Sequence, residues 1–293
     1  MRFFTTVLAF LTFFSIAYAG ERQPIATFDW AVAETLSILD IAPLGVMQLN
    51  TYNEWTDKKI ISCDAIELGL GSMPNLELVS HLNPSLILGD NTSPNGKLTN
   101  IAPTENISLF PITGDPWQAM QDFTLALAER VGRNEEAKRF IHEYEQQFSK
   151  LRYRLSGDEE PLIIIQFRDD RHVWIYGENS LLQGALDQLG LTNAWNKPTN
   201  YVGVSTVSID ELPAIEGRLV VLKSPHYTSS IGDRLDRDGL WQALLRLRNG
   251  NAVYLPVEYW PVGGLPSALR FADALVEALE APTEPQPTAS SQH

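Results

Sequence analysis

Cysteine is almost missing from this 293-residue chain, which contains only Cys63. A single cysteine cannot form an intramolecular disulfide, whatever the redox state of the compartment. The fold must therefore be stabilised by buried apolar side chains, and a chain of this length can build one or two hydrophobic cores.

Positive charge is also scarce. The 22 Lys and Arg residues are outnumbered by 36 Asp and Glu residues, which gives a net charge of −14. Such an acidic surface repels nucleic acid and anionic lipid headgroups, although it can dock on a basic protein partner. The composition therefore predicts no nucleic-acid partner.

Long apolar runs are missing after the first 19 residues. Those residues contain Arg2, an apolar run from 7 to 14, and the small-x-small sequence Ala17-Tyr18-Ala19 before Gly20. This pattern is typical of a cleaved signal peptide, with a buried helix or membrane anchor as the alternative. No cysteine lies near the cleavage site, so we expect residues 1–19 to be removed and an exported, soluble chain without a lipid anchor.

Motifs of catalysis are not found. The segment 89–97 resembles a phosphate-binding loop, but six residues separate its glycines instead of four, and Leu98 replaces the required Ser or Thr. No Gly-x-Ser-x-Gly elbow occurs. The charged run 168–171 is typical of a solvated turn between strands. The sequence thus gives no positive case for an enzyme.

Metal-binding spacing is missing as well. The five histidines are scattered, and none is paired at i,i+4; they are His81, His142, His172, His226 and His293. A protein zinc site needs several neutral imidazoles or thiolates that converge. We therefore predict no metal ligands from the protein, while a direct metal-ion carrier stays open because distant histidines can converge in a fold.

Two blocks of alternating strand and helix patterns make up most of the chain. Such alternation predicts an α/β fold of two lobes with mostly parallel sheets. In the first block we expect strands over 43–49, 65–68 and 85–89 and a helix over 76–82. In the second we expect strands over 161–167, 173–176, 218–222 and 252–255, and helices over 180–189, 240–247 and 267–279.

An amphipathic segment separates the two blocks. Its apolar residues recur every three or four positions from Phe140 to Leu155, which predicts one helix of about 20 residues, roughly 30 Å long. A stiff helix of this kind would limit the relative motion of the lobes and leave a ligand cleft between them. The predicted organisation is signal peptide 1–19, N-terminal lobe 20–133, linking helix 134–156, C-terminal lobe 157–281 and disordered tail 282–293.

Aromatic residues gather in the predicted loops. Large amphipathic rings at strand ends suit a cleft for a bulky ligand, although each ring taken singly can equally serve packing. The residues are Trp55, Trp195, Tyr201, Tyr227, Tyr259 and Trp260.

Several stretches together resemble the periplasmic ferric hydroxamate-binding proteins and their relatives, the single-helix-linked substrate-binding proteins of siderophore and cobalamin ABC importers. The stretches are 69–77, 82–85, 177–182, 193–195, 207–210, 240–243 and 260–268. The resemblance covers nearly the whole mature chain. It implies a monomeric periplasmic protein that carries a ferric siderophore to the permease subunits of an ABC importer in the inner membrane. It implies no cofactor, because iron travels inside the siderophore.

The resemblance also implies the site. Trp55, Tyr201 and Trp260 would form an aromatic wall, and Glu77 and Asp210 would dock on the permease, with Glu211 as a substitute for Asp210. Each of these carboxylates can equally be an ordinary residue in the first turn of a helix. The further ligand-binding candidates are Tyr227, Tyr259, Lys223 and Arg168.

Two positions depart from the hydroxamate-binding pattern. Gly71 stands where the family has an arginine that contacts the iron-bound hydroxamate oxygens, and the polar run 90–93 replaces an expected tyrosine. A lost charged hydrogen bond is worth about 1.5–3 kcal/mol, so the choice of ligand should change unless a basic residue of the second lobe compensates. A hydroxamate siderophore is the leading hypothesis. The alternatives are a catecholate or citrate siderophore, haem or a corrinoid in the same fold, a secreted enzyme, or a direct metal-ion carrier.

Overall fold

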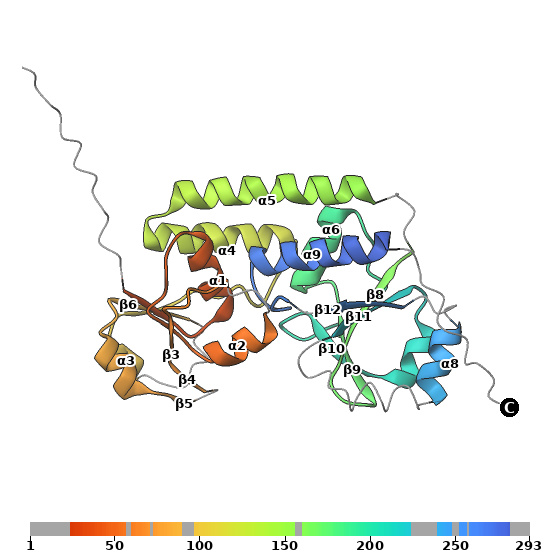
Figure 1. Cartoon of the computed structure of the whole chain (residues 1–293), viewed down its shortest axis with the longest axis horizontal. Coiled ribbons are helices and arrows are strands. Elements are labelled where there is room, and N and C mark those ends of the chain that lie inside the picture. Colours follow the sequence, from red (N-terminus) through yellow and green to blue (C-terminus); the bar gives the residue numbers. More distant parts are fainter. Residues whose placement is uncertain are drawn as a thin grey trace, which may run out of the picture.

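The computed structural model describes residues 24–56, 60–70, 73–89, 97–155, 160–223, 239–247, 252–256 and 258–281. The predicted signal peptide 1–19, the tail 282–293, Tyr227 and Gly71 lie outside these residues. The described chain forms two α/β lobes, each built on a five-stranded sheet, with a layer of helices along one side of both (Figure 1). The predicted α/β fold class is confirmed.

The sheet of the N-terminal lobe is entirely parallel, in the order β3-β2-β1-β6-β7. Its centre is fully buried, as expected for a parallel sheet covered on both faces. A small antiparallel hairpin, β4-β5, follows β3. The strands are β1 (Ile25–Thr27), β2 (Gly45–Val46), β3 (Ile66–Glu67), β4 (Gly69–Leu70), β5 (Met73–Pro74), β6 (Leu86–Gly89) and β7 (Thr104–Asn106).

Local signals fix the helices of this lobe. Asp29 caps α1 by accepting the Val32 N–H, and Asn75 caps α3 by accepting the Leu78 N–H. Asp115 caps α4, which has Pro116 in its first turn and Gly132 in the left-handed region after its end. The helices are α1 (Trp30–Ile38), α2 (Leu49–Trp55), α3 (Leu76–Leu82) and α4 (Pro116–Val131), with a 3-10 turn η1 (Leu98–Asn100).

The sheet of the C-terminal lobe is mixed, in the order β10-β9-β8-β11-β12. Strands β8, β11 and β12 are parallel, whereas β9 and β10 run antiparallel to their neighbours. The antiparallel step follows from the tight turn over 168–171, where Asp169 Oδ1 accepts the N–H groups of Arg171 and His172. The strands are β8 (Leu162–Phe167), β9 (His172–Tyr176), β10 (Val204–Ser208), β11 (Arg218–Lys223) and β12 (Ala252–Pro256).

Helices and strands alternate in this lobe largely as the sequence predicts. The all-buried pattern of β8 is that of a strand covered on both faces. The helical elements are α6 (Leu181–Leu189), the 3-10 helix η2 (Ile209–Ala214), α8 (Gly239–Leu247) and α9 (Leu265–Glu280).

The expected long helix is α5 (Asn134–Arg154), which lies along one side of both lobes in Figure 1. It does not join the lobes alone. It packs against α4, α6 and α9, and α9 also contacts α1 and α4. One hydrophobic core consequently runs through both lobes, from Ile25 in β1 to Leu162 in β8. The lobes are thus held together by packing as well as by chain connection.

One predicted strand is largely wrong. The run 43–49 was expected to be extended throughout, but only Gly45 and Val46 pair with neighbours, and α2 begins at Leu49. Gln48 turns the chain by adopting a left-handed conformation with φ 52°. Glycine is needed at position 45 of this strand, because a Cβ there would lie 2.4 Å from Leu68 Cδ2. No helix among the described residues has the length and hydropathy to cross a membrane.

Candidate ligand-binding site

Aromatic rings from both lobes meet where the lobes join. Trp260, which follows β12 in the C-terminal lobe, packs edge-to-face against Trp55 at 4.8 Å and against Trp30 at 4.6 Å between ring centroids. Trp30 packs in the same way against Tyr52 at 5.5 Å. We call these four residues the aromatic cluster. Edge-to-face packing at these distances is favourable, so the rings stabilise one another across the seam.

The positions of these rings are set by the elements that carry them. Trp30 is the first residue of α1, directly after the Asp29 cap, and its Nε1–H donates to the Met47 carbonyl at 2.7 Å. Tyr52 and Trp55 lie on α2, one turn apart. The Trp260 N–H donates to Ser267 Oγ at 3.1 Å, which fixes the loop before α9.

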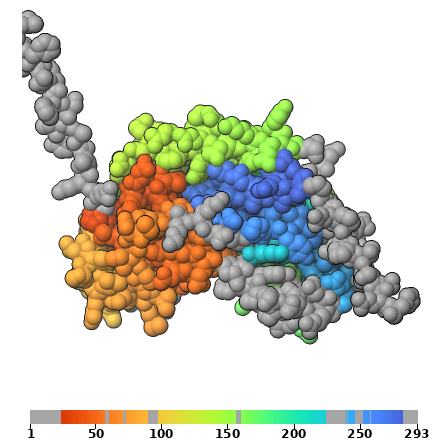
Figure 2. Space-filling view, viewed as in Figure 1, coloured from red at the N-terminus to blue at the C-terminus, as the bar shows by residue number. Residues whose placement is uncertain are grey.

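The two predicted tryptophans differ in exposure. Trp55 is only 5 % exposed, whereas Trp260 and Trp30 are partly exposed. Figure 2 shows the red and orange surface of the N-terminal lobe beside the blue surface of the C-terminal lobe, with the green α5 along one side of both. Because Trp30 and Trp260 are partly exposed, they can contact a ligand, whereas the buried Trp55 packs against Trp260.

Tyrosines predicted for the site are placed very differently from one another. Tyr201 is 67 % exposed in the turn before β10. Tyr259 is fully buried and packs against Phe271 at 5.8 Å. Its ring has no surface left for a ligand, so we remove Tyr259 from the proposed contacts. An aromatic residue beside Trp260 looks the same in the sequence whether it points to the surface or to the core.

The two basic candidates, Lys223 and Arg168, lie at the same edge of the C-terminal sheet. The register pairs Leu222 with Gln166, so Lys223 ends β11 beside the end of β8, which Arg168 follows directly. Both side chains are exposed, and Lys223 Nζ lies 5.1 Å from the Tyr254 ring centroid. The carboxyl edge of parallel strands is where α/β proteins place ligands, and an anionic group would be favoured there.

The hairpin β4-β5 adds an apolar feature that the sequence did not suggest. Leu70 and Met73 pair across it and are 61 % and 76 % exposed. Glu67 stabilises the base of the hairpin by accepting hydrogen bonds from the N–H groups of Asn50 at 2.8 Å and Gly69 at 3.1 Å. Gly69 is required there, because its φ is 128° and a Cβ would lie 2.7 Å from the Met73 carbonyl oxygen. The hairpin thus holds two apolar side chains in solvent, on either side of position 71.

A buried carboxylate lies behind the aromatic cluster. Glu34 of α1 is fully buried and accepts hydrogen bonds from Tyr52 Oη at 2.8 Å, from Ser267 Oγ at 2.7 Å and from the Gly264 N–H at 3.2 Å. Burial raises the pKa of Glu34 to about 6, although these hydrogen bonds and the charge of Arg270 oppose the rise. No sequence pattern pointed to Trp30, Tyr52, Glu34 or Ser267. For Glu34 and Ser267 the reason is that a Glu or Ser in a helical segment ordinarily faces solvent.

The raised pKa predicts how stability depends on pH. The folded protein holds the proton on Glu34 more tightly than the unfolded chain, whose carboxyl has a pKa near 4.5. This stabilisation is therefore complete below pH 4.5 and is lost as the pH rises through about 6. Between pH 7.5 and pH 4.5, we expect Glu34 to add about 2 kcal/mol to the free energy of unfolding.

Urea unfolding at these pH values would measure the effect in the wild type and in Glu34→Gln. Because the variant cannot ionise, the pH dependence of its stability should lack this component. Equal pH dependence in the two proteins would contradict the prediction.

The predicted docking carboxylates are exposed on separate lobes. Glu77 lies in the first turn of α3, and Asp210 lies in the first turn of η2. Glu211 is already engaged, because its side chain accepts the Ser208 N–H at 3.3 Å in a capping box. Glu211 is therefore a poor substitute for Asp210. The docking role itself stays a prediction.

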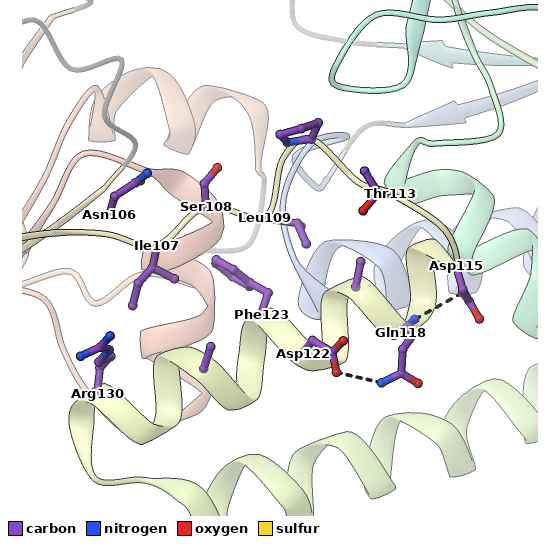
Figure 3. Close-up of a pocket in the computed structure, with 13 residues that line it drawn as sticks. Asn106, Ile107, Ser108, Leu109, Thr113, Asp115, Gln118, Asp122, Phe123 and Arg130 are labelled. Atoms are coloured by element: carbon purple, nitrogen blue, oxygen red, sulfur yellow. Dashed lines mark hydrogen bonds between the residues drawn. The ribbon is translucent and has the colours of Figure 1, made fainter.

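A separate surface pocket of about 580 Å³ lies along α4 (Figure 3). Its polar groups are occupied with one another. Asp115 accepts the Trp117 and Gln118 N–H groups, and Gln118 Nε2 donates to Asp122 at 2.9 Å. Asp115, Gln118 and Asp122 of this pocket are thus already engaged in hydrogen bonds within α4. Among the described residues, no three His, Cys, Asp or Glu side chains lie close enough to hold a metal ion.

The fold and the seam define a two-lobed binding protein, with rings from both lobes at their junction and no described cluster of metal ligands. Comparison with known proteins agrees. The chain belongs to the family described as periplasmic binding protein, which it matches over residues 25–259.

Two curated relatives illustrate the family. The chain is 31 % identical to the iron(3+)-hydroxamate-binding protein FhuD of Escherichia coli over 269 residues, which is 90 % of each chain. It is 24 % identical to the Fe(3+)-citrate-binding protein YfmC of Bacillus subtilis, with 83 % of this chain and 76 % of the relative covered. The expected resemblance to hydroxamate-binding proteins is therefore confirmed.

Solved structures support the fold. The FhuD structure from Vibrio cholerae with bound Fe3+-Desferal superposes with a TM-score of 0.79 at 22 % identity, covering 88 % of this chain and 98 % of that one. The triscatecholate siderophore-binding protein FeuA of Bacillus subtilis gives a TM-score of 0.69 at 19 % identity, covering 88 % and 92 %. Cargoes of different chemistry thus occur on this fold.

Proposed function

We propose that this protein is the periplasmic substrate-binding component of an ABC importer and that it binds a ferric siderophore, preferably of the hydroxamate type. The aromatic cluster at the seam carries the proposal. A ferric siderophore already surrounds its iron with its own oxygen ligands, so the protein needs rings and a few polar groups and no metal ligands. The 31 % identity to a hydroxamate-binding relative over nearly the whole chain supports this cargo.

The ligand would rest on the seam between the lobes. Trp260 and Trp55 are the proposed aromatic wall, with Tyr201 as an exposed ring from the turn before β10. Lys223 and Arg168 would face any anionic group of the ligand, and Tyr227 stays a proposed contact outside the described residues. Leu70 and Met73, which flank position 71, would meet hydrocarbon parts of the ligand where the family has an arginine.

The proposed role is binding and delivery without chemistry. The protein would act as a monomer, would use no cofactor of its own, and would carry iron only inside the ligand. Residues 1–19 would direct export to the periplasm and be removed there. Glu77 and Asp210, exposed on different lobes, would contact basic residues of the permease subunits in the inner membrane.

A siderophore of citrate or catecholate type is the second candidate. The observation that favours it is the pair of exposed basic residues, Lys223 and Arg168, at one edge of the second sheet. Such residues would attract a cargo more acidic than a hydroxamate. On this alternative, Lys223→Ala should weaken binding of the acidic cargo and leave hydroxamate binding unchanged.

Quenching of tryptophan fluorescence tests the proposal. The mature protein would be titrated with ferric hydroxamates, catecholates and citrate-type siderophores, with haem and cobalamin for the remaining cargoes and free Fe3+ for direct metal binding. We expect saturable quenching in the micromolar range or below by a hydroxamate. Tighter binding of another cargo would assign the protein to that cargo class. Absence of quenching by every ligand of the panel would refute the siderophore function.

A further inference from the structure

The hydrogen bonds of Glu34 connect the two lobes. Tyr52 belongs to α2 of the N-terminal lobe, whereas Ser267 and Gly264 belong to the start of α9 in the C-terminal lobe. Glu34 itself projects from α1. A single fully buried side chain thus accepts donors from both sides of the seam where the aromatic cluster lies.

Each of the two side-chain donors also leads to a ring of the cluster. Ser267 Oγ, which donates to Glu34, accepts the Trp260 N–H at 3.1 Å. Tyr52, the other side-chain donor, packs edge-to-face on Trp30 and precedes Trp55 on α2 by one turn. The Glu34 carboxylate is therefore linked to the Trp260 backbone through Ser267, and to the Trp30 ring through Tyr52.

The surroundings of Glu34 are tightly packed. A Cβ added at Gly263 would lie 2.6 Å from Glu34 Oε2 and 2.6 Å from Ser267 Oγ. The Gly264 N–H is at the N-terminus of α9, where the helix dipole favours a negative charge. Position 263 must therefore remain glycine for the carboxylate to sit against its donors.

Charge is what lets Glu34 hold these donors. An ionised carboxylate only accepts hydrogen bonds, so its two oxygens can serve the Tyr52 and Ser267 hydroxyls and the Gly264 N–H together. A protonated carboxyl group or an amide carries hydrogen on one of its two polar atoms. With three donors converging, at least one of the bonds would then be lost.

We propose that Glu34 is the positioning residue of the aromatic cluster, holding Trp260 and Tyr52 across the seam in the arrangement that binds the ligand. The inference rests on the proposed function, since the cluster is the proposed binding surface. Glu34 does not touch the ligand; it acts through Ser267 and Tyr52. Protonation of Glu34 would rearrange the cluster and weaken ligand binding.

The groups that set the protonation of Glu34 come from three elements. Arg270 of α9 favours its ionised form, Tyr52 of α2 donates to it, and Tyr144 of α5 lies near enough for its own pKa to be affected by both Glu34 and Arg270. The buried faces of α4 and β1, which also contact α1, contain no ionisable side chain. Burial brings the titration of Glu34 to about pH 6.

Two opposite responses to pH separate positioning from simple stabilisation. Protonation of Glu34 stabilises the fold, as argued above for the raised pKa, yet it should weaken ligand binding. A residue that merely stabilised the fold would leave affinity unchanged at pH values where the protein is fully folded. Affinity and stability should therefore move in opposite directions as the pH falls through 6.

The experiment measures affinity for ferrioxamine B, the Fe3+-Desferal complex, between pH 7.5 and pH 5. Wild type, Glu34→Gln and the control Glu129→Gln would be compared; Glu129 is an exposed carboxylate on α4. We expect Glu34→Gln to bind at least 10-fold more weakly than wild type at pH 7.5 and to change little with pH. Wild type and Glu129→Gln should lose a similar factor below about pH 6. The three proteins differ only at position 34 or 129, so the difference isolates Glu34.

A second variant covers the case in which Glu34→Gln does not fold. Ser267→Ala keeps the charge but removes the donor that joins Glu34 to the Trp260 N–H. We expect it to weaken binding several-fold and to move the loss of affinity to higher pH, because the Ser267 hydrogen bond lowers the pKa of Glu34. Wild-type affinity and unchanged pH dependence in every folded variant would overturn the inference.

A measurement without ligand distinguishes this inference from the proposed function. Near-ultraviolet circular dichroism reports the packing of the tryptophan rings. It should change in the wild type with a midpoint near pH 6 and stay constant in Glu34→Gln. If wild type binds no member of the panel, the proposed function fails, and this spectrum still decides whether Glu34 positions the cluster. Identical spectra of wild type and Glu34→Gln at every pH would refute it.

Discussion

Replacing Trp260 by alanine should weaken binding of the preferred ferric siderophore by at least about 30-fold. Trp260 is the ring that contacts both Trp55 and Trp30, and it is partly exposed at the seam. Truncating a central aromatic anchor typically costs 2 kcal/mol or more, which corresponds to that factor. Isothermal titration calorimetry would measure the change independently of the fluorescence of the lost tryptophan.

Two further variants serve as controls for this prediction. Trp260→Phe keeps an apolar ring and should lose much less affinity than Trp260→Ala. Tyr153→Ala removes an exposed ring on α5, which lies on the other side of the molecule in Figure 1, and should bind like the wild type. Unchanged affinity in a folded Trp260→Ala protein would show that the ligand does not use the aromatic cluster.

Replacing Phe148 by alanine should lower the free energy of unfolding by about 3–5 kcal/mol. Phe148 is 1 % exposed on α5 and packs edge-to-face against Trp117 of α4, with ring centroids 4.8 Å apart. The substitution opens a cavity in the helical layer that both lobes share. Urea unfolding followed by fluorescence and by circular dichroism would give the change.

The number of transitions in the unfolding curve is a second test of the shared core. Because one hydrophobic core includes β1 of the first lobe and β8 of the second, we expect a single transition that coincides for both probes. Tyr153→Ala on the same helix, with a side chain 91 % exposed, should change stability by less than about 0.5 kcal/mol. Two separate transitions in the wild type would contradict the shared core.

Most of the fold could be predicted because its signals are local. The periodicity of α5, the apolar run of β8 and the strand–turn–helix order need only neighbouring residues to be interpreted. Three helices, α1, α2 and α4, were missed, although local signals in the sequence mark the starts of α1 and α4. Asp29 before α1 and Asp115-Pro116 at α4 are ordinary helix starts, and Gly132 ends α4.

The site was predictable only in part, since it is built from contacts between distant residues. Trp55 and Trp260 are 205 positions apart, and a resemblance to known proteins was needed to bring them together. Glu34 lies 233 positions from Ser267, and no local pattern distinguishes it from a solvated carboxylate. Tyr259, in contrast, was predicted to contact the ligand but is fully buried. Its burial depends on the path of the loop after β12, which no local pattern shows.

The shared helical layer also bears on how such proteins diversify. Relatives in this fold retain TM-scores of 0.65–0.79 with this chain although identity falls to 16–22 %, and their cargoes include a hydroxamate, a triscatecholate and staphyloferrin B. Because one hydrophobic core joins the lobes, the loops at the seam can change while the relative arrangement of the lobes is kept. If the proposed contacts hold, exposed positions outside this core, such as Leu70 and Met73, are where substitutions would change the cargo at the least cost to the fold.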